Sequence, residues 1–154
     1  MIVVADTSPL NYLVLVGAEH TLGSLFTEVV IPSAVRDELL ADAAPTAVRK
    51  WMGSPPDWLR VVDSAAGARI AGLNPGESEA ITLALAMRAD MLLIDERAGR
   101  AEAYRRGLEV TGTLGVLAAA AKRGMIDPII IVSRLKTTSF RATEEQYARV
   151  IAAR

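Results

Sequence analysis

Short β-branched and aliphatic runs alternate along the chain with longer segments in which apolar residues recur at helical spacing. Several of the longer segments begin with Ser, Pro, Asn or Thr, which are residues that start helices well. This alternation predicts an α/β fold, in which helices cover both faces of a parallel sheet. The predicted strands are residues 2–5, 29–31, 58–62, 91–94 and 109–111, and the predicted helices are residues 8–18, 32–42, 45–52, 77–89, 98–106, 114–123, 128–135 and 143–153, although the β-branched run at 129–132 also fits a strand.

The composition limits the chemistry that the chain can perform. Its 154 residues match one domain of ordinary size, and no repeat or linker divides them, so we expect a single domain over residues 1–154. The absence of cysteine excludes zinc–thiolate sites and a cysteine nucleophile. The one histidine, His20, argues against a Ser-His-Asp triad and excludes a metal site built from several histidines. Any metal ion must therefore be held by oxygen ligands.

The N-terminal segment lacks the features of a targeting signal. It has no basic region, and Asp6 interrupts its first apolar run. The longest fully apolar stretch near the N-terminus, residues 12–18, is far too short to span a bilayer. We therefore expect a cytoplasmic protein that does not associate with a membrane.

Acidic and basic residues are unevenly distributed along the chain. Residues 1–96 contain 6 Lys and Arg against 13 Asp and Glu, a net charge of −7, whereas residues 97–154 contain 11 against 5, a net charge of +6. Solvated surfaces of opposite sign would explain this asymmetry. The pattern also fits an acidic metal pocket beside a basic surface that receives a polyanion.

Two aspartates directly follow predicted strands. Asp6 follows residues 2–5, and Asp95 follows residues 91–94. The carboxyl ends of parallel strands form one edge of the sheet, where open α/β sheets bind ligands, so both side chains should lie at that edge. Either aspartate could instead serve only as a helix cap.

Three glutamates in predicted helices are candidates to join these aspartates. Glu38 lies at the margin of the apolar face formed by Val35 and Leu39, about 60° from Val35 at roughly 100° per residue. Glu77 and Glu79 begin a helix that is apolar nearly all round. They lie about 200° apart on it, so a regular helix cannot direct both to one site. Periodicity does not choose between these two, and both also stabilise a helix N-terminus.

Carboxylates gathered into one pocket would repel each other at neutral pH. Each pair about 4 Å apart costs up to about 4 kcal/mol at an effective dielectric of about 20. A divalent cation removes this cost by neutralising the cluster, whereas a single inward glutamate could also be neutralised by a buried arginine. Ligands that are all oxygen atoms suit Mg²⁺ or Mn²⁺, with waters completing the octahedron.

Five segments occur in a distinctive order along the chain: ADTSPLNYL, IPSAVRDEL, GESEAITLALA, LLIDERAGR and TGTLGVL. In this order they resemble PIN-domain proteins, and especially the branch grouped with VapC-type toxins of bacterial toxin–antitoxin pairs. The resemblance extends from Val3 to about Tyr147. It implies a three-layer α/β/α sandwich around a central parallel sheet of about five strands, and a ribonuclease that depends on Mg²⁺ or Mn²⁺.

The resemblance also implies roles for individual residues. Many relatives have an aspartate followed by alanine at the third acidic position, which Glu79 and Ala80 match here. Thr7 would orient Asp6 by a hydrogen bond. The implied catalytic and metal-binding residues are Asp6, Glu38, Glu79 and Asp95, with Glu77 and Glu96 as reserve ligands.

Family behaviour further implies the partners of the protein. Arg97 and Arg100 would contact the backbone of an RNA substrate, and Lys122 and Arg123 are weaker candidates for the same role. The 2 Phe, 3 Tyr and 2 Trp show no pattern that indicates a platform for stacking single-stranded RNA. A toxin would form a homodimer and bind a small antitoxin whose tail blocks the acidic pocket. The expected contact surfaces are the apolar helices near residues 8–26 and 32–52.

Three other functions fit parts of the pattern. A receiver domain phosphorylated on aspartate would need an acidic neighbour for Asp6 and a lysine near Thr111, and the chain has neither. A dinucleotide-binding domain would need a G-x-G-x-x-G motif after the first strand, which is absent. A PIN-like protein-binding module that has lost catalysis is the remaining alternative, and the presence of all the expected acids argues against it.

Overall fold

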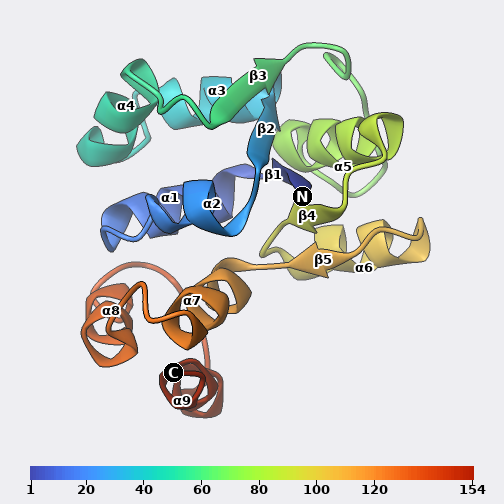
Figure 1. Ribbon diagram of the computed structural model, residues 1–154. Coiled ribbons are helices and arrows are strands. Elements are labelled where there is room, and N and C mark those ends of the chain that lie inside the picture. Colours follow the sequence, from blue (N-terminus) through green and yellow to red (C-terminus); the bar gives the residue numbers. More distant parts are fainter.

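The computed structural model describes all 154 residues. A parallel sheet lies at the centre of the molecule (Figure 1). The strands are β1 (Ile2–Ala5), β2 (Glu28–Pro32), β3 (Leu59–Val62), β4 (Met91–Leu93) and β5 (Val110–Thr111). Their order across the sheet is β3-β2-β1-β4-β5, and every neighbouring pair is parallel. The chain thus builds the sheet outward from β1 in both directions. The order reverses between β1 and β4, which is the switch point where such sheets bind ligands.

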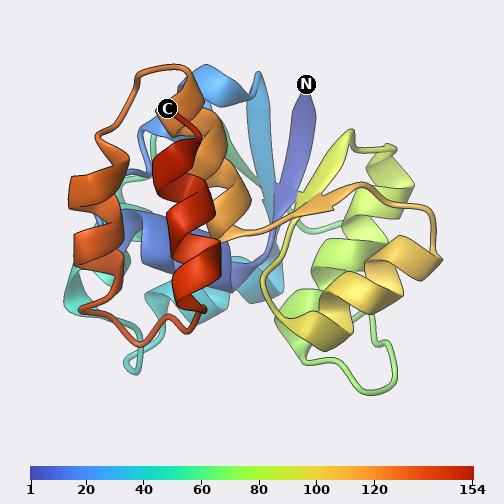
Figure 2. The same ribbon diagram turned by 90° about the horizontal axis from the view of Figure 1, so that it is seen from below.

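Helices cover both faces of this sheet. They are α1 (Thr7–Leu15), α2 (Thr21–Leu25), α3 (Ser33–Leu40), α4 (Thr46–Gly53), α5 (Pro75–Met87), α6 (Arg97–Arg105), α7 (Thr113–Lys122), α8 (Pro128–Leu135) and α9 (Glu144–Ala152). In Figure 2 the sheet stands between α5 and α6 on one side and the other helices on the opposite side. This arrangement is the three-layer α/β/α sandwich with a five-stranded parallel sheet that the sequence predicts. None of the helices combines the length and hydrophobicity needed to cross a membrane.

Two hydrophobic clusters, one on each face of the sheet, hold the layers together. Val3 and Ala5 of β1 belong to a cluster of 22 buried residues, which extends into α1–α4 and α7–α9. Val4 points to the other face and joins a cluster of 11 buried residues shared with α5 and α6. Both faces of β1 are therefore buried, which explains why its sequence is a continuous apolar run. This burial fixes the position of the strand end that leads into Asp6.

The predicted elements are present, with one local difference. The segment at 129–132 lies in α8, which confirms the predicted helix over 128–135 and not the alternative strand, because Asp127 accepts a hydrogen bond from the backbone N–H of Ile129 at 2.9 Å and so caps a helix. The short helix α2 was not predicted. It has only 5 residues, too few to show a periodic pattern.

Candidate active site

Asp6 lies at the switch point of the sheet, between the ends of β1 and β4. Its backbone N–H donates to the carbonyl of Leu93 at 2.8 Å, which joins the two strand ends. Asp6 occupies the N-cap position of α1, but its side chain makes no capping hydrogen bond. The residue is only 5% exposed. The carboxylate is thus held at the ligand-binding edge of the sheet without serving as a helix cap.

A small cavity of about 220 Å³ opens beside Asp6, and we call it the acidic pocket. Its acidic members come from four separate segments of the chain. The carboxylates of Asp6 and Glu38 both approach the backbone of Gly76. A Cβ atom at Gly76 would lie 2.5 Å from Glu38 Oε1 and 3.2 Å from Asp6 Oδ1, so only glycine leaves room for both carboxylates. The residues that line the pocket are Asp6, Thr7, Ser8, Asn11, Tyr12, Glu38, Asn74, Glu77 and Glu96.

The carboxylates of this pocket disturb one another's ionisation. Burial raises the pKa of Asp6 from 3.8 to about 7, and repulsion from Glu77, Glu38 and Asp95 adds to this shift. The backbone amide of Thr7 opposes it by hydrogen bonding to the Asp6 carboxylate. The pocket therefore holds more negative charge than its protein surroundings neutralise.

Glu77 faces the acidic pocket because a capping box fixes it at the start of α5. Its backbone N–H donates to Asn74 Oδ1 at 2.8 Å, and its own Oε1 accepts from the backbone N–H of Asn74 at 3.1 Å. The second oxygen, Oε2, has no hydrogen-bond donor and lies near Gly99. Burial raises the pKa of Glu77, and the nearby Glu96 and Glu38 raise it further.

Glu79, the residue expected at the third acidic position, lies outside the acidic pocket. Its Oε1 accepts hydrogen bonds from Ser33 Oγ and from the backbone N–H of Ala34, both at 3.1 Å, and its Oε2 accepts from the backbone N–H of Gly67 at 3.0 Å. It therefore holds the first turn of α3 and the loop after β3, beside a separate cavity of about 380 Å³. The angle of about 200° between the two glutamates on α5 explains why only Glu77 reaches the pocket.

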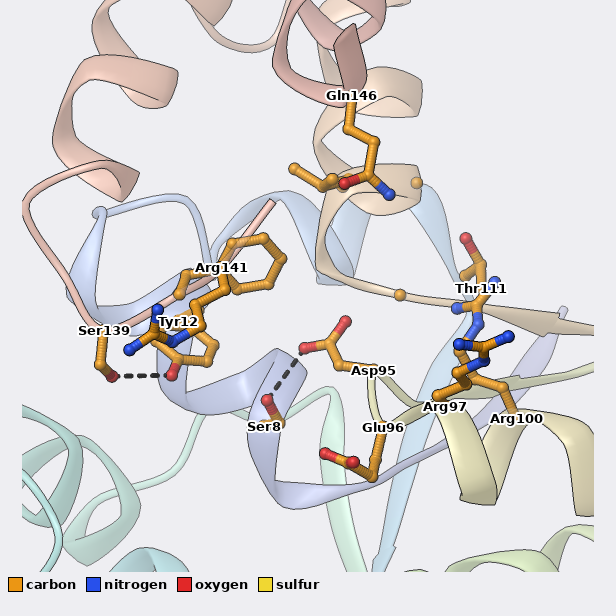
Figure 3. Close-up of a pocket in the computed structure, with 14 residues that line it drawn as sticks. Ser8, Tyr12, Asp95, Glu96, Arg97, Arg100, Thr111, Ser139, Arg141 and Gln146 are labelled. Atoms are coloured by element: carbon orange, nitrogen blue, oxygen red, sulfur yellow. Dashed lines mark hydrogen bonds between the residues drawn. The ribbon is translucent and has the colours of Figure 1, made fainter. Parts of the chain in front are cut away.

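Asp95 lies near Asp6, but its carboxylate is fully hydrogen-bonded. Oδ1 accepts from the backbone N–H of Thr113 at 2.7 Å, and Oδ2 accepts from Thr113 Oγ1 at 2.7 Å. Oδ2 also accepts from Ser8 Oγ at 3.0 Å, as Figure 3 shows. A Cβ at Gly112 would lie 2.5 Å from Asp95 Oδ1, which explains the glycine of the TGT segment. Asp95 thus joins the end of β4 to the first turns of α1 and α7.

Glu96 and Thr7, which were also expected to take part in the site, have contacts that the sequence did not predict. Glu96 is exposed, and it lines the acidic pocket where Asp95 does not. The hydroxyl of Thr7 is buried and has no hydrogen-bond partner, so the backbone of Thr7 and not its side chain contacts Asp6. The side-chain hydrogen bond expected between Thr7 and Asp6 is therefore not formed.

The acidic pocket supplies donors that suit a hard cation, although they do not form a complete coordination shell. No three acidic side chains stand close enough together to hold a metal ion as they are placed. Mg²⁺ commonly keeps several waters and uses one or two protein carboxylates. Asp6 and Glu38, which approach each other over Gly76, provide such a pair. The donor set therefore fits a hydrated Mg²⁺ or Mn²⁺ ion.

A larger cavity of about 530 Å³ adjoins the acidic pocket, and we call it the arginine pocket. The two cavities share Ser8, Tyr12 and Glu96. Figure 3 shows Arg97 and Arg100 from α6 on one side of the arginine pocket and Arg141 on the other. None of the three forms an ion pair, and the only hydrogen bond among them runs from Arg100 to the carbonyl of Ile94 at 3.0 Å. The residues that line it are Ser8, Tyr12, Asp95, Glu96, Arg97, Arg100, Thr111, Gly112, Leu114, Gly115, Ser139, Phe140, Arg141 and Gln146.

Only part of this positive charge is predictable from the sequence. Arg97 and Arg100 were expected from their position after Asp95, and both line the arginine pocket. Lys122 and Arg123 lie outside both cavities. Arg141 was missed, because it follows α8 and only the packing of α9 against α7 brings it to the sheet edge.

Comparisons with known proteins relate the chain to PIN domains. The family model described as "DUF3368: PIN domain" matches residues 2–153. Among solved structures, a PilT N-terminus domain protein, SSO1118, from the hyperthermophilic archaeon Sulfolobus solfataricus P2 is similar, with a TM-score of 0.57 and 19% sequence identity over 78% of this chain and 93% of that chain. At this identity the likeness concerns the fold alone. No curated protein matches the chain.

Proposed function

The chain belongs to the PIN-domain family, whose fold is generally that of a nuclease, and we propose that it is an endoribonuclease dependent on a divalent metal ion. The observation that carries this proposal is the convergence of four acidic side chains on one pocket next to a second pocket with three unpaired arginines. Repulsion in the first pocket favours a cation, and the charge of the second favours a polyanion. RNA is the polyanion that the family resemblance implies.

Asp6 and Glu38 are the pair that would hold Mg²⁺ or Mn²⁺, and Glu77 would join them as a third ligand once the ion draws its side chain closer. Asp6 and Glu38 approach each other over Gly76, and Glu77 has one oxygen without a hydrogen-bond donor. Bound there, the ion would lower the pKa of a coordinated water and neutralise charge that develops on the phosphate. Glu77 takes the ligand role expected for Glu79, because the Glu79 carboxylate is fully occupied by other donors.

The remaining residues of the two pockets position the RNA and move a proton. Arg97 and Arg100 contact phosphates, so that the scissile phosphate faces the acidic pocket. Glu96 is exposed at the boundary of the two pockets, and it accepts a proton from the attacking water. The water oxygen bonds to phosphorus and the bond to the 3′ oxygen breaks, which leaves a 5′-phosphate and a 3′-hydroxyl that takes its proton from solvent. Asp95 is a positioning residue that fixes α1 and α7 at this edge.

Cleavage assays test this proposal directly. Purified protein is incubated with single-stranded RNA in Mg²⁺ or Mn²⁺, with and without EDTA, and beside Asp6→Asn. We expect EDTA and Asp6→Asn each to abolish cleavage, and restored Mg²⁺ or Mn²⁺ to recover it. Asp37→Asn is the matched control, because Asp37 neighbours Glu38 but is exposed and paired with Arg36.

Two results of that assay would contradict the proposal. Cleavage that resists EDTA, or that persists in Asp6→Asn, would exclude metal-dependent chemistry at the acidic pocket. Absence of cleavage across a broad panel of RNAs would favour the alternative, a PIN-like protein-binding module without catalytic activity. In that case Asp6 and Glu38 would serve only as an acidic docking surface.

We further propose that the protein is the toxin of a toxin–antitoxin pair, as its resemblance to VapC-type proteins implies. A small antitoxin would insert its tail into the acidic pocket and compete with RNA. The contact surface would be formed by α1, α3 and α4, which pack against one another and carry the exposed Leu40. A neighbouring reading frame whose product binds this chain and stops RNA cleavage would support the proposal, and a product that binds without inhibition would oppose it.

The same surface is our candidate for a homodimer interface. The chain has a mass of 16.4 kDa. Light scattering after size exclusion should therefore give twice this mass, and a charged substitution such as Leu40→Glu should return the monomer. A monomer at all accessible concentrations would oppose the dimer without affecting the ribonuclease proposal.

A further inference from the structure

The arginine pocket contains an aromatic pair whose members are far apart in the sequence. Tyr12 comes from α1 and Phe140 from the loop between α8 and α9. Their ring centroids lie 5.0 Å apart with an interplanar angle of 82°, which is edge-to-face packing. Tyr12 Oη lies 2.8 Å from Ser139 Oγ, so the loop is fixed against α1. Both rings are only half-buried. Part of their surface therefore remains open to the pocket.

Two side chains with unused hydrogen-bond donors line the same cavity as these rings. Arg141 makes no ion pair or hydrogen bond with the protein. Gln146 accepts a hydrogen bond from the backbone of Thr143 with its Oε1 at 2.8 Å, which leaves its side-chain NH₂ free to donate. In Figure 3 the side chain of Gln146 extends from α9 toward the cavity, and Arg141 lies beside Tyr12. A planar ligand stacked on the aromatic pair would thus meet donors at its edge.

We propose that Tyr12, Phe140, Arg141 and Gln146 form an aromatic subsite that binds one unpaired base of single-stranded RNA. This inference rests on the proposed ribonuclease function. Stacking on an aromatic side chain accepts any base and requires that the base leave its neighbours, so it selects single strands. Tyr12 and Ser8 line both pockets, which places this base next to the scissile phosphate. The cavity of about 530 Å³ lies within the usual size range of small-ligand sites.

The charges around the subsite favour a nucleotide over a peptide side chain. Arg97 and Arg100 lie on the opposite side of the cavity from Arg141, as Figure 3 shows. A base on the aromatic pair would therefore leave its phosphates within the region of the two α6 arginines. An aromatic peptide side chain would occupy the rings but would give these arginines no anion.

Binding of a fluorescent RNA tests the subsite without depending on cleavage. The probe is a single-stranded hexanucleotide RNA that contains one 2-aminopurine, added in Mg²⁺ to the Asp6→Asn protein. Stacking should quench the 2-aminopurine, and Phe140→Leu in this background should weaken binding by roughly 5- to 100-fold. Phe140→Tyr restores a ring and should recover most of the affinity. Tyr104→Leu is the matched control, because Tyr104 is 78% exposed on α6 and lies outside both pockets.

Thermal unfolding followed by circular dichroism checks that Phe140→Leu is folded. A loss of binding is evidence for the subsite only if this variant remains folded at the temperature of the assay. Equal binding and equal quenching in Phe140→Leu would overturn the subsite, as would a duplex RNA that competes as well as the single strand. Displacement of the probe by an acidic peptide but not by unlabelled RNA would also overturn it, in favour of a protein partner.

Cleavage by the protein that retains Asp6 separates this inference from the ribonuclease proposal. If that protein cuts the hexanucleotide but Phe140→Leu and abasic positions leave the rate unchanged, the subsite is wrong and the ribonuclease proposal stands. If no RNA is cut but Phe140-dependent quenching is observed, the subsite stands and the ribonuclease proposal fails.

Discussion

Two glutamates that lie two residues apart at the start of α5 have opposite surroundings. Glu77 and Glu79 are almost equally buried, at 4% and 6% exposure. Burial raises the pKa of Glu77, the carboxylates that it faces raise it further, and one of its oxygens has no donor. Glu79 faces away from these acids and accepts three hydrogen bonds. Burial therefore does not distinguish a candidate metal ligand from a structural carboxylate, whereas the number of donors does.

The two strand-end aspartates show the same contrast. Asp95 accepts three hydrogen bonds from Ser8 and Thr113, so it anchors helices to the sheet edge. Asp6 receives only the backbone amide of Thr7, and its neighbours are acidic. Removing the charge of Asp6 should relieve repulsion, whereas removing that of Asp95 should leave donors without acceptors. Substitutions in the acidic pocket should thus affect activity, and substitutions of the anchoring acids should affect stability.

Glu77→Gln and Glu79→Gln test this distinction on one helix. We expect Glu77→Gln to lower the cleavage rate by roughly 10²- to 10³-fold with little change in stability, because glutamine keeps the capping-box acceptor but loses the charge. Glu79→Gln should keep most of the activity but lower the free energy of unfolding by about 1–3 kcal/mol, because one buried donor loses its acceptor. Single-turnover cleavage and urea unfolding measure the two effects. The reverse pattern would assign the ligand role to Glu79, as the family resemblance implies.

The pH dependence of stability tests whether burial and the neighbouring acids raise the pKa of Asp6. Asp6 titrates near 3.8 when unfolded and at about 7 when folded, so the folded state binds more protons between these values. The free energy of unfolding should therefore fall as pH rises from about 4 to 7, by at most about 4 kcal/mol from this residue. Asp6→Asn should remove most of this slope and be more stable than the unsubstituted protein at pH 8. Urea unfolding in EDTA at several pH values measures this difference.

The unfolding curves of Asp6→Asn and the unsubstituted protein can also contradict the predicted role of Asp6. Parallel curves for Asp6→Asn and the unsubstituted protein would show that folding does not raise the pKa of Asp6. Adding Mg²⁺ at pH 8 should stabilise the unsubstituted protein, by about 2.7 kcal/mol at 100 times the dissociation constant, and should not stabilise Asp6→Asn. Equal stabilisation of both proteins would place the ion elsewhere.

The sequence predicted the strand ends well but not the direction of the helix acids. Asp6 and Asp95 follow apolar runs whose burial on both faces fixes the sheet, so their position at one edge was predictable. Glu77 and Glu79 begin a helix that is apolar nearly all round, and such a helix has no polar face to set its rotation. The rotation is instead set by the capping box of Asn74 and by the donors that Glu79 meets on α3 and the following loop.

The aromatic subsite could not be predicted for a different reason. Tyr12 and Phe140 are separated by almost the whole chain, and no short motif joins them. Their packing depends on how the loop after α8 lies against α1. Patterns of periodicity describe single elements and do not fix such long-range packing.

Gly76→Ala tests whether the close approach of Asp6 and Glu38 matters for activity. The new Cβ would lie 2.5 Å from Glu38 Oε1, so the carboxylate must move by several tenths of an ångström. We expect cleavage to fall about tenfold while the melting temperature changes little, because a displaced ligand weakens positioning more than packing. Gly53→Ala is the matched control, since nothing lies within 4 Å of a Cβ there. Full activity in Gly76→Ala would argue that Asp6 and Glu38 do not share one ion.

Arg97→Gln should have the smallest effect and tests whether the unpaired arginines bind phosphates. Because glutamine cannot neutralise a phosphate, RNA should bind about threefold more weakly at moderate salt, and the slope of log K against log salt should fall by about 0.7. Arg105→Gln is the control on the same helix, because Arg105 is exposed and already paired with Glu102. Binding is measured in the Asp6→Asn background across a salt series. A similar decrease in slope for both variants would mean that α6 attracts RNA only through its overall charge. Unpaired arginines would then contact the RNA no more often than paired ones.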